Sequence, residues 1–187
     1  MEGLDCKVVV SSGARKVAEA EGAALPEADY AENDFSSPYA SGSNPPDAVV
    51  VIPCSLKTLG EIANGVGNTL ITRAAEVALK ERKKLVLVVR ETPYSLITIK
   101  NMETVTLAGG VVLPATPGFY SKPKKIEDMI DFIVARVLDQ LGLKHNLGKR
   151  WKATPLSDPL QGAPVLPQHR KSKLPKQAGS TRSKVLK

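Results

Sequence analysis

Apolar residues in this chain gather in short runs, several rich in valine and isoleucine, that alternate with stretches of helical periodicity. A run of four to eight apolar residues without polar alternation is typical of a parallel strand covered on both faces. Strands that alternate with helices predict an α/β fold with a mostly parallel sheet. We expect four strands, at residues 6–11, 48–53, 84–90 and 110–114.

The segments between and after these strands predict helices at residues 13–21, 56–81, 95–108 and 125–142, the second broken near Gly65–Gly67. The last helix has the clearest pattern, because its apolar residues recur at intervals of three and four. This stripe predicts a face that packs on the core or on another subunit, and it consists of Ile126, Met129, Ile130, Ile133, Val134, Val137, Leu138 and Leu141.

The segment Pro53-Cys-Ser-Leu-Lys-Thr58 joins a predicted strand to a predicted helix. Such a junction directs free backbone N–H groups and the positive end of the helix dipole at one point. Ser55 adds a hydroxyl and Lys57 an ammonium group, so phosphate or a phosphorylated cofactor is a natural occupant. The alternative is that Ser55 only caps the helix and that Lys57 is a surface residue.

Polar side chains also follow the next two predicted strands. Arg90 and Glu91 come directly after one, and Tyr120 lies in a loop rich in proline and glycine after the other. In open α/β sheets, ligands bind in the crevice at the carboxyl ends of the strands. The predicted crevice therefore receives Ser55, Lys57, Thr58, Arg90, Glu91 and Tyr120.

The motifs Pro-Cys-Ser-Leu-Lys-Thr, Arg-Glu-Thr-Pro and Pro-Gly-Phe-Tyr, with the closing helix 126–142, resemble the flavin prenyltransferases of the UbiX type. The resemblance covers about Asp5 to Trp151. It implies a Rossmann-like, flavodoxin-like three-layer fold and a homo-oligomer, a dodecamer in the family. It also implies transfer of a dimethylallyl group from dimethylallyl phosphate to reduced FMN. The prenylated FMN would serve a partner decarboxylase in ubiquinone or aromatic-acid metabolism.

The same resemblance assigns roles to individual side chains. The residues implied to hold FMN are Ser11, Ser55, Leu56, Lys57, Thr58 and Arg90. Those implied to grip or work on the prenyl phosphate are Lys80, Glu91, Tyr120 and Arg136, with Arg73 and Glu21 nearby and Trp151 over the prenyl pocket. Alternatives from the residues alone are that Arg73 and Lys80 are solvated charges on one helix face and that Arg136 pairs with Asp139.

Release of phosphate from an allylic carbon is easier when its developing negative charge is neutralised. Many prenyl-transferring enzymes use Mg²⁺ held by aspartate-rich motifs, and this chain has no such motif. We therefore expect a metal-free site in which Lys80, Arg90, Tyr120 and Arg136 supply the positive charge and hydrogen bonds. Glu91 would shuttle a proton.

The chain also departs from the family pattern. Family members begin with a strand and a turn of the Gly-Ala-Ser-Gly type, and the residues here match only from the second strand, at Lys7–Ser11. Asn44 stands where an aromatic residue is more usual. A fragment and a degenerate, non-catalytic homologue both fit this expectation. A further alternative is an FMN-dependent cysteine-type decarboxylase of the same fold.

The net charge of +7 lies in the last part of the chain. Residues 152–187 hold eight Lys or Arg against one acidic residue, Asp158, which leaves residues 1–151 neutral. This predicts a flavoprotein domain at 1–151 and a basic, proline-containing disordered tail at 152–187. No aromatic residue follows Trp151, which argues against nucleic-acid binding.

Neither a long apolar run nor a secretory signal is present, so we expect no membrane association. A cytoplasmic protein is expected, or an organellar one in a eukaryote. The two cysteines, Cys6 and Cys54, predict small buried side chains rather than a disulfide or a metal site.

Overall fold

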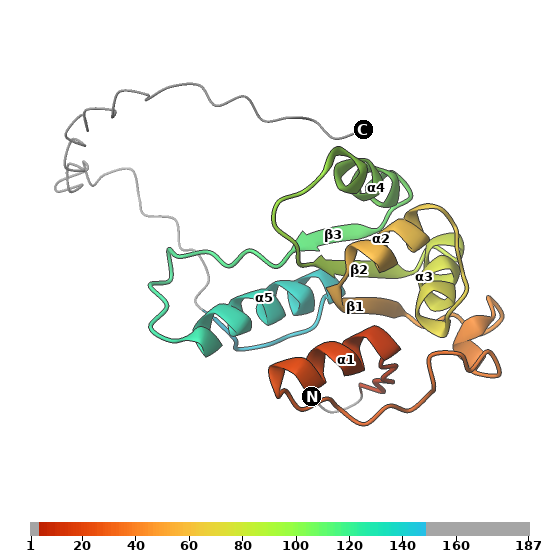
Figure 1. Cartoon of the computed structure of the whole chain (residues 1–187), viewed down its shortest axis with the longest axis horizontal. Coiled ribbons are helices and arrows are strands. Elements are labelled where there is room, and N and C mark those ends of the chain that lie inside the picture. Colours follow the sequence, from red (N-terminus) through yellow and green to blue (C-terminus); the bar gives the residue numbers. More distant parts are fainter. Residues whose placement is uncertain (1–3, 149–187) are drawn as a thin grey trace, which may run out of the picture. The chain divides into compact units, whose positions relative to one another are not determined.

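A computed structural model describes residues 4–148. The predicted tail 152–187 and Trp151 lie outside the described residues. The strands are β1 (Ala48–Cys54), β2 (Lys84–Val89) and β3 (Val111–Pro114), and the helices are α1 (Ser12–Glu21), η1 (Pro38–Ala40, a 3₁₀ helix), α2 (Leu56–Ala63), α3 (Leu70–Lys80), α4 (Leu96–Leu107) and α5 (Ile126–Leu141) (Figure 1).

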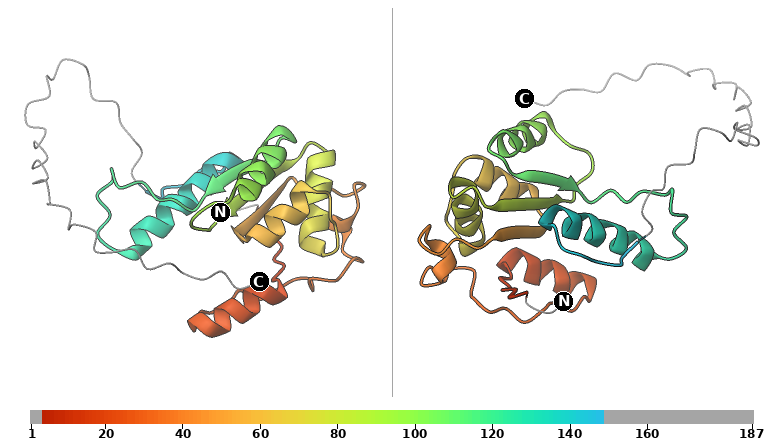
Figure 2. Two further views of the ribbon diagram at one scale, coloured as in Figure 1. Left: turned by 45° about the horizontal axis from the view of Figure 1, so that its top comes forward. Right: turned by 180° about the vertical axis from the view of Figure 1, so that it is seen from behind.

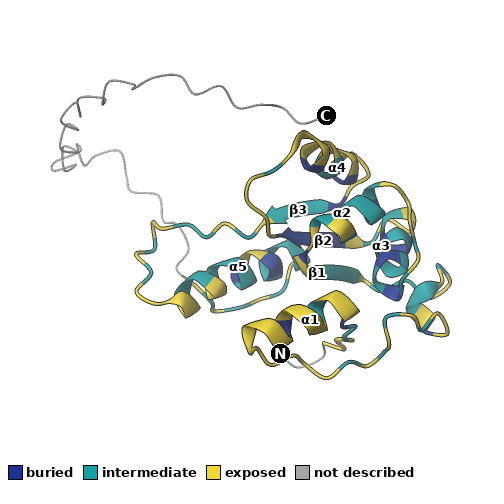
Figure 3. Cartoon of the chain, in the orientation of Figure 1, coloured by how far each residue is buried: buried dark blue, intermediate teal, exposed yellow. Residues whose placement is uncertain are grey.

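The three strands form one parallel sheet in the order β1-β2-β3. Successive residues of a strand point to opposite faces, and β2 buries both sets. Leu85, Leu87 and Val89 pack in the core cluster that contains residues of α2, α3 and α4, whereas Val86 and Val88 pack with Val137 of α5. The result is the predicted three-layer α/β arrangement, with β2 as the most buried element (Figure 3).

Four helices begin with a hydroxyl that accepts a hydrogen bond from the backbone N–H three residues later, Ser11 doing so at the start of α1. Ser55 Oγ accepts from Thr58 N, Thr69 Oγ1 from Thr72 N, and Ser95 Oγ from Thr98 N, all at 3.2 Å. Such caps satisfy N–H groups that have no partner inside the helix. No helix within residues 4–148 has the length and apolar character to span a membrane.

The predicted strand at residues 6–11 is wrong. This segment makes a single parallel bridge, between Val9 and Tyr30, and residues 10–11 lead directly into α1. Asp29 and Tyr30 donate backbone hydrogen bonds to the carbonyl of Val8 at 2.9 and 3.4 Å. An apolar β-branched run becomes a strand only where a partner backbone continues the ladder, and the partner here is a short part of a loop.

The remaining predicted elements are confirmed to within a few residues. The predicted helix 56–81 is divided into α2 and α3 around Gly65, whose φ of 67° favours glycine. The stripe on α5 is divided between two environments. Its Val137 is buried in the core, whereas Ile126 and Ile130 near its amino end are exposed (Figure 3).

Helix α4 is apolar on both its inner and its outer side. Val105 is buried against the core. Leu96, Ile97 and Leu107 are 68%, 74% and 82% exposed. Lys100 and Glu103 are exposed between these ends of the helix, so the apolar side chains form exposed patches, which often mark contact surfaces. The outer side of α4 therefore has the character of a contact surface.

Candidate functional site

The carboxyl ends of the three strands are tied together by backbone hydrogen bonds. Arg90 N donates to Cys54 O at 3.4 Å, and Ala115 N donates to Val89 O at 2.9 Å. The segment after β1, the segment after β2 and the segment after β3 therefore leave the sheet side by side at one edge (Figures 1 and 2). This is the edge at which the sequence places the crevice.

At the end of β1, the Ser55 turn has the geometry of a helix cap. Besides its bond to Thr58 N, Ser55 Oγ lies 3.1 Å from Thr58 Oγ1. Lys57 Nζ lies 2.9 Å from Glu61 Oε1 on the surface of α2, and Leu56 packs against the core. The capping alternative thus describes Ser55 in this structure, and the ammonium of Lys57 is already paired.

At the end of β2, Arg90 and Glu91 are both exposed. Glu91 Oε1 accepts a hydrogen bond from Thr92 N at 2.9 Å, which holds the carboxylate close to its own backbone. The guanidinium of Arg90 forms no hydrogen bond or ion pair within residues 4–148. An exposed, unpaired guanidinium beside the amino terminus of α2 is well suited to an anion.

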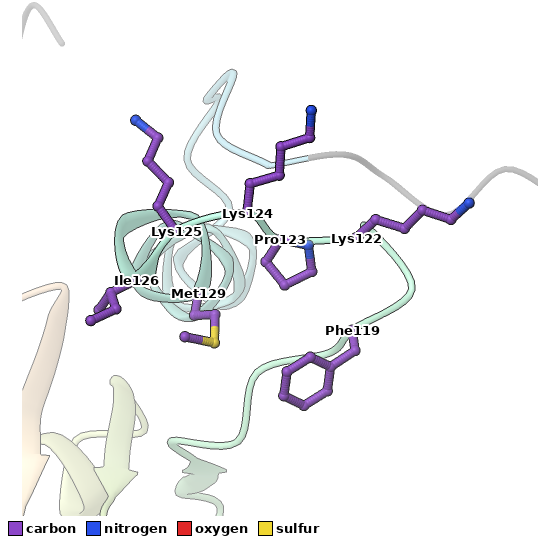
Figure 4. Close-up of a pocket in the computed structure, with 7 residues that line it drawn as sticks. All are labelled: Phe119, Lys122, Pro123, Lys124, Lys125, Ile126 and Met129. Carbon is purple, nitrogen blue, oxygen red and sulfur yellow. The ribbon is translucent and has the colours of Figure 1, made fainter.

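After β3, the loop that carries Tyr120 folds back onto α5. The Tyr120 ring packs edge to face on Phe132, with ring centroids 5.9 Å apart. A hollow of about 470 Å³ lies beside it, and its apolar side chains include Phe119 and Met129. The ammonium groups of the lysines around it point away from this space, and its lining residues are Phe119, Lys122, Pro123, Lys124, Lys125, Ile126 and Met129 (Figure 4).

The same loop is anchored at the start of α5 by Asp128. Its carboxylate accepts from Lys124 N at 2.8 Å and from Lys125 N at 3.3 Å. The hydrogen bond from Lys124 N, followed by that from Lys125 N, holds the pKa of Asp128 below its usual value, despite the opposing effect of desolvation. The charged form of Asp128 therefore fixes the end of the loop that follows Tyr120.

Arg136 borders a second hollow, of about 260 Å³, between β3 and α5. Thr116 and Phe132 also line it, so it adjoins the loop that carries Tyr120. Neither this hollow nor the one beside Phe119 includes Ser55 or Arg90. Arg136 NH1 donates to Asp139 Oδ2 at 2.8 Å, which is the pairing that the helix spacing allows as an alternative.

The other four predicted site residues within the described chain belong to α1 or its cap and to α3. Ser11 caps α1 by accepting from Ala14 N at 3.0 Å, and Glu21 is the exposed last residue of α1. Lys80 ends α3, four residues before β2 begins, so it lies near the amino edge of the sheet and is paired with Glu81.

Arg73, also on α3, is fully engaged at the surface. Its NH1 lies 2.8 Å from Glu76 Oε2, and its Nε donates to the carbonyl of Ala40 at 3.0 Å. Within one copy of the chain, the solvated-charge alternative therefore describes both Arg73 and Lys80. The prediction for Trp151 falls outside the described residues.

Cys54, at the end of β1, is fully buried. Burial raises the pKa of its thiol from 9.0 to about 12. A thiol that stays protonated at neutral pH is a poor nucleophile, so Cys54 acts as a small core residue. Residues 4–148 contain no group of three or more His, Cys, Asp or Glu side chains that could hold a metal ion.

His145 was not predicted as a site residue and lies close to Asp139, the partner of Arg136. Its Nε2 is 3.1 Å from Asp139 Oδ1, and its side chain is 5% exposed. The available signal was weak, because a single histidine four residues after the end of a helix has no distinctive spacing. Asp139 entered the sequence argument only as a partner for Arg136.

Comparison with known proteins gives consistent matches over most of the chain. Residues 1–138 match the Flavoprotein family. The flavin prenyltransferase UbiX of Thermoplasma acidophilum is 45% identical over 158 residues, which cover 81% of this chain and 88% of that protein. UbiX of Methanocaldococcus jannaschii is 54% identical over 124 residues, or 66% of this chain and 67% of that protein.

Two solved structures give the same result. AnUbiX, in complex with FMN and dimethylallyl pyrophosphate, has a TM-score of 0.73 at 43% identity, covering 78% of this chain and 81% of that one. A dodecameric FMN-dependent UbiX-like decarboxylase from Escherichia coli has a TM-score of 0.75 at 37% identity, covering 82% and 86%. The chain therefore belongs to the Flavoprotein family and, within it, to the flavin prenyltransferases of the UbiX type.

Proposed function

We propose that this protein is a flavin prenyltransferase that joins a dimethylallyl group from dimethylallyl phosphate to reduced FMN. The observation that carries the proposal is its 45% identity to the Thermoplasma flavin prenyltransferase across 88% of that protein. The joined strand ends support it, because they place a helix amino terminus and an unpaired guanidinium at one edge of the sheet.

The residues at this edge fit a bound flavin phosphate. The first turn of α2 has backbone N–H groups directed outward, and Arg90 lies beside them across the hydrogen bond to Cys54. We assign FMN binding to the segment Ser55–Thr58 and to Arg90, with Ser11 as a further contact. FMN would supply the nucleophilic ring atoms of the reaction.

The protein side chains would act on the leaving phosphate and on protons. Arg136 and Tyr120 lie on adjoining surfaces of α5 and of the loop after β3, so both can hold a phosphate that lies beside Phe132. A guanidinium binds phosphate through two parallel N–H bonds, which neutralises charge without a metal ion. Glu91 would move the proton that is lost during attack, and Trp151 would cover the prenyl pocket.

The proposed site draws on more than one copy of the chain. Lys80 lies before the amino end of β2 and Glu91 after its carboxyl end. A strand of this length separates its ends by about 17–20 Å, which a lysine side chain cannot span. If Lys80 binds the prenyl phosphate, it comes from a second copy. We therefore propose a homo-oligomer, as in the dodecameric Escherichia coli relative, with the outer side of α4 as a contact surface.

The proposal extends to the partner enzyme, the compartment and the remaining donors for the flavin phosphate. The prenylated flavin would pass to a decarboxylase that uses it as a cofactor, and the reaction would take place in the cytoplasm. The phosphate site would gain further N–H groups from a strand and Gly-rich turn beside β1, because β1 is an edge strand within residues 4–148.

Incubation with reduced FMN and dimethylallyl phosphate under anaerobic conditions and in EDTA tests the function. We expect mass spectrometry to find FMN that has gained one dimethylallyl unit. A parallel reaction with dimethylallyl pyrophosphate tests the donor, and a peptide that ends in cysteine tests the decarboxylase alternative. Absence of the prenylated product, a requirement for metal, or decarboxylation of the peptide would contradict the proposal.

A further inference from the structure

Asp139 connects two side chains that lie on either side of the end of α5. Its Oδ2 accepts from Arg136 NH1 at 2.8 Å, and its Oδ1 lies 3.1 Å from His145 Nε2. Arg136 is 48% exposed, Asp139 20% and His145 5%. The three side chains therefore form a chain of contacts that runs from a buried imidazole to a guanidinium at the surface of a hollow.

The second nitrogen of His145 fixes the hydrogen-bonding pattern. His145 Nδ1 accepts a hydrogen bond from Leu147 N at 3.2 Å, so this nitrogen carries no proton in this arrangement. The proton is then on Nε2, which donates it to Asp139. A neutral imidazole with both nitrogens engaged holds the carboxylate in one orientation.

The turn that carries His145 is itself well defined. Helix α5 ends at Gly142, whose φ of 74° and hydrogen bond to Asp139 O reverse the chain. Leu143 N donates to Leu138 O at 3.0 Å, a pair of bonds typical of a glycine-terminated helix. This reversal brings His145 back over the last turn of α5, where it meets Asp139.

An exposed Arg–Asp pair three residues apart on a helix is by itself weak and leaves both side chains mobile. The additional contact with a buried histidine changes this, because it restrains the carboxylate to which the guanidinium is bound. Within residues 4–148, the guanidinium of Arg136 has no other hydrogen-bond partner. One NH₂ group of Arg136 is thus held by Asp139, and the other N–H groups of the guanidinium can bind an anion.

We propose that Asp139 and His145 are positioning residues, which orient Arg136 toward the phosphate of the prenyl donor in the hollow between β3 and α5. This inference rests on the proposed function, since it takes Arg136 as the phosphate ligand. Arginine loses side-chain freedom when it clamps a phosphate, and a guanidinium ordered in advance loses less on binding. The expected benefit is tighter binding of the donor.

Two substitutions at His145 separate positioning from a structural role. In His145→Gln the amide nitrogen takes the place of Nε2 and can still donate to Asp139, whereas Leu147 N loses its acceptor. In His145→Asn the amide oxygen takes the place of Nδ1 and can still accept from Leu147 N, whereas Asp139 loses its donor. Each variant keeps one of the two hydrogen bonds.

We expect His145→Asn to raise the KM for dimethylallyl phosphate by about tenfold, because small misplacements of a binding group are costly. His145→Gln should keep a KM close to that of wild type, and Asp139→Asn should behave like His145→Asn. If His145 has only a structural role, the variant that loses the hydrogen bond from Leu147 N should have the lower melting temperature and the higher KM. That variant is His145→Gln. That result, or equal KM values for all three variants and wild type, would overturn the inference.

Arg136→Ala distinguishes this failure from failure of the function itself. If Arg136→Ala raises the KM while the His145 and Asp139 variants do not, Arg136 binds the donor and its positioning by Asp139 is wrong. If Arg136→Ala leaves the KM unchanged, the assignment of Arg136 to the phosphate is wrong, and the positioning inference falls with it. FMN affinity, measured in parallel, should be the same in all four variants.

Discussion

The substitution Ser55→Ala separates a capping hydroxyl from a cofactor-binding one, because the chain contains a matched control. Ser55-Leu-Lys-Thr58 begins α2, and Ser95-Leu-Ile-Thr98 begins α4 with the same serine and threonine spacing. In both, the serine Oγ accepts from the backbone N–H three residues later at 3.2 Å, and the two hydroxyls lie 3.1 and 3.0 Å apart. As a cap, each serine should contribute equally.

Loss of either cap should lower the free energy of unfolding by about 1 kcal/mol. In a domain of this size, such a loss lowers the melting temperature by about 2–4 °C. Ser55→Ala should in addition weaken FMN binding, because a hydrogen bond to a charged phosphate contributes about 1.5–3 kcal/mol. That corresponds to an increase in Kd of about tenfold to a hundredfold.

Titration of FMN, followed by flavin fluorescence, and thermal unfolding without FMN together give both quantities for each variant. We expect Ser55→Ala and Ser95→Ala to have similar melting temperatures and clearly different Kd values. If the two variants bind FMN equally well, Ser55 is a helix cap and nothing more. If both weaken FMN binding to the same degree, the effect arises from loss of stability or from the whole sheet edge.

Three other predictions follow from single contacts. Glu91→Gln should keep FMN affinity and slow prenyl transfer by about a hundredfold in a turnover assay, the usual scale for a lost general acid or base; unchanged turnover would contradict the proton role. Gly110→Ala should lower the free energy of unfolding by about 1–3 kcal/mol in urea, because overpacking strains a core; its Cβ would lie 2.6 Å from Val105 Cγ1. In the folded protein, a thiol reagent at pH 8 should modify the exposed Cys6 and spare the buried Cys54. Because burial raises the pKa of Cys54 to about 12, deprotonation favours the unfolded chain, and the free energy of unfolding should fall as the pH rises above 9.0.

The sheet was largely predictable from the sequence, because burial on both faces leaves a clear pattern. The run Lys84–Val89 contains no polar interruption, and its five apolar residues are all buried in β2. The run at 6–11 has the same β-branched character and forms only one bridge. Composition records which residues suit a strand, but pairing depends on which backbone lies alongside, and a local pattern contains no information about that.

The candidate site was predictable where it depends on topology. Arg90 and the end of β1 meet because parallel strands end at one edge, which the order of elements already requires. The contact between Asp139 and His145 depends instead on how the chain reverses at Gly142. Spacing along a helix predicts neighbours three and four residues apart, and His145 lies beyond the helix, so no periodicity could have indicated it.

The position of Lys80 gives a direct test of whether the site is shared between copies. Lys80 and Glu91 lie beyond opposite ends of β2, so one copy of the chain cannot bring both to one phosphate. Lys80→Ala and Glu91→Gln should each be nearly inactive alone. In oligomers reassembled from equal amounts of both, a site that takes Lys80 from one copy and Glu91 from another is intact with a probability of about one quarter.

We therefore expect the mixture to recover about a quarter of wild-type turnover per site, measured after unfolding and joint refolding or after co-expression. The control mixture, Lys80→Ala with Lys80→Ala,Glu91→Gln, contains no intact Lys80 and should stay inactive. If both residues acted within one copy, every site in the first mixture would lack one of them and no turnover would return. Recovery of turnover therefore requires a site that is shared between copies. If no turnover returns, either Lys80 does not bind the phosphate or the site is not shared between copies.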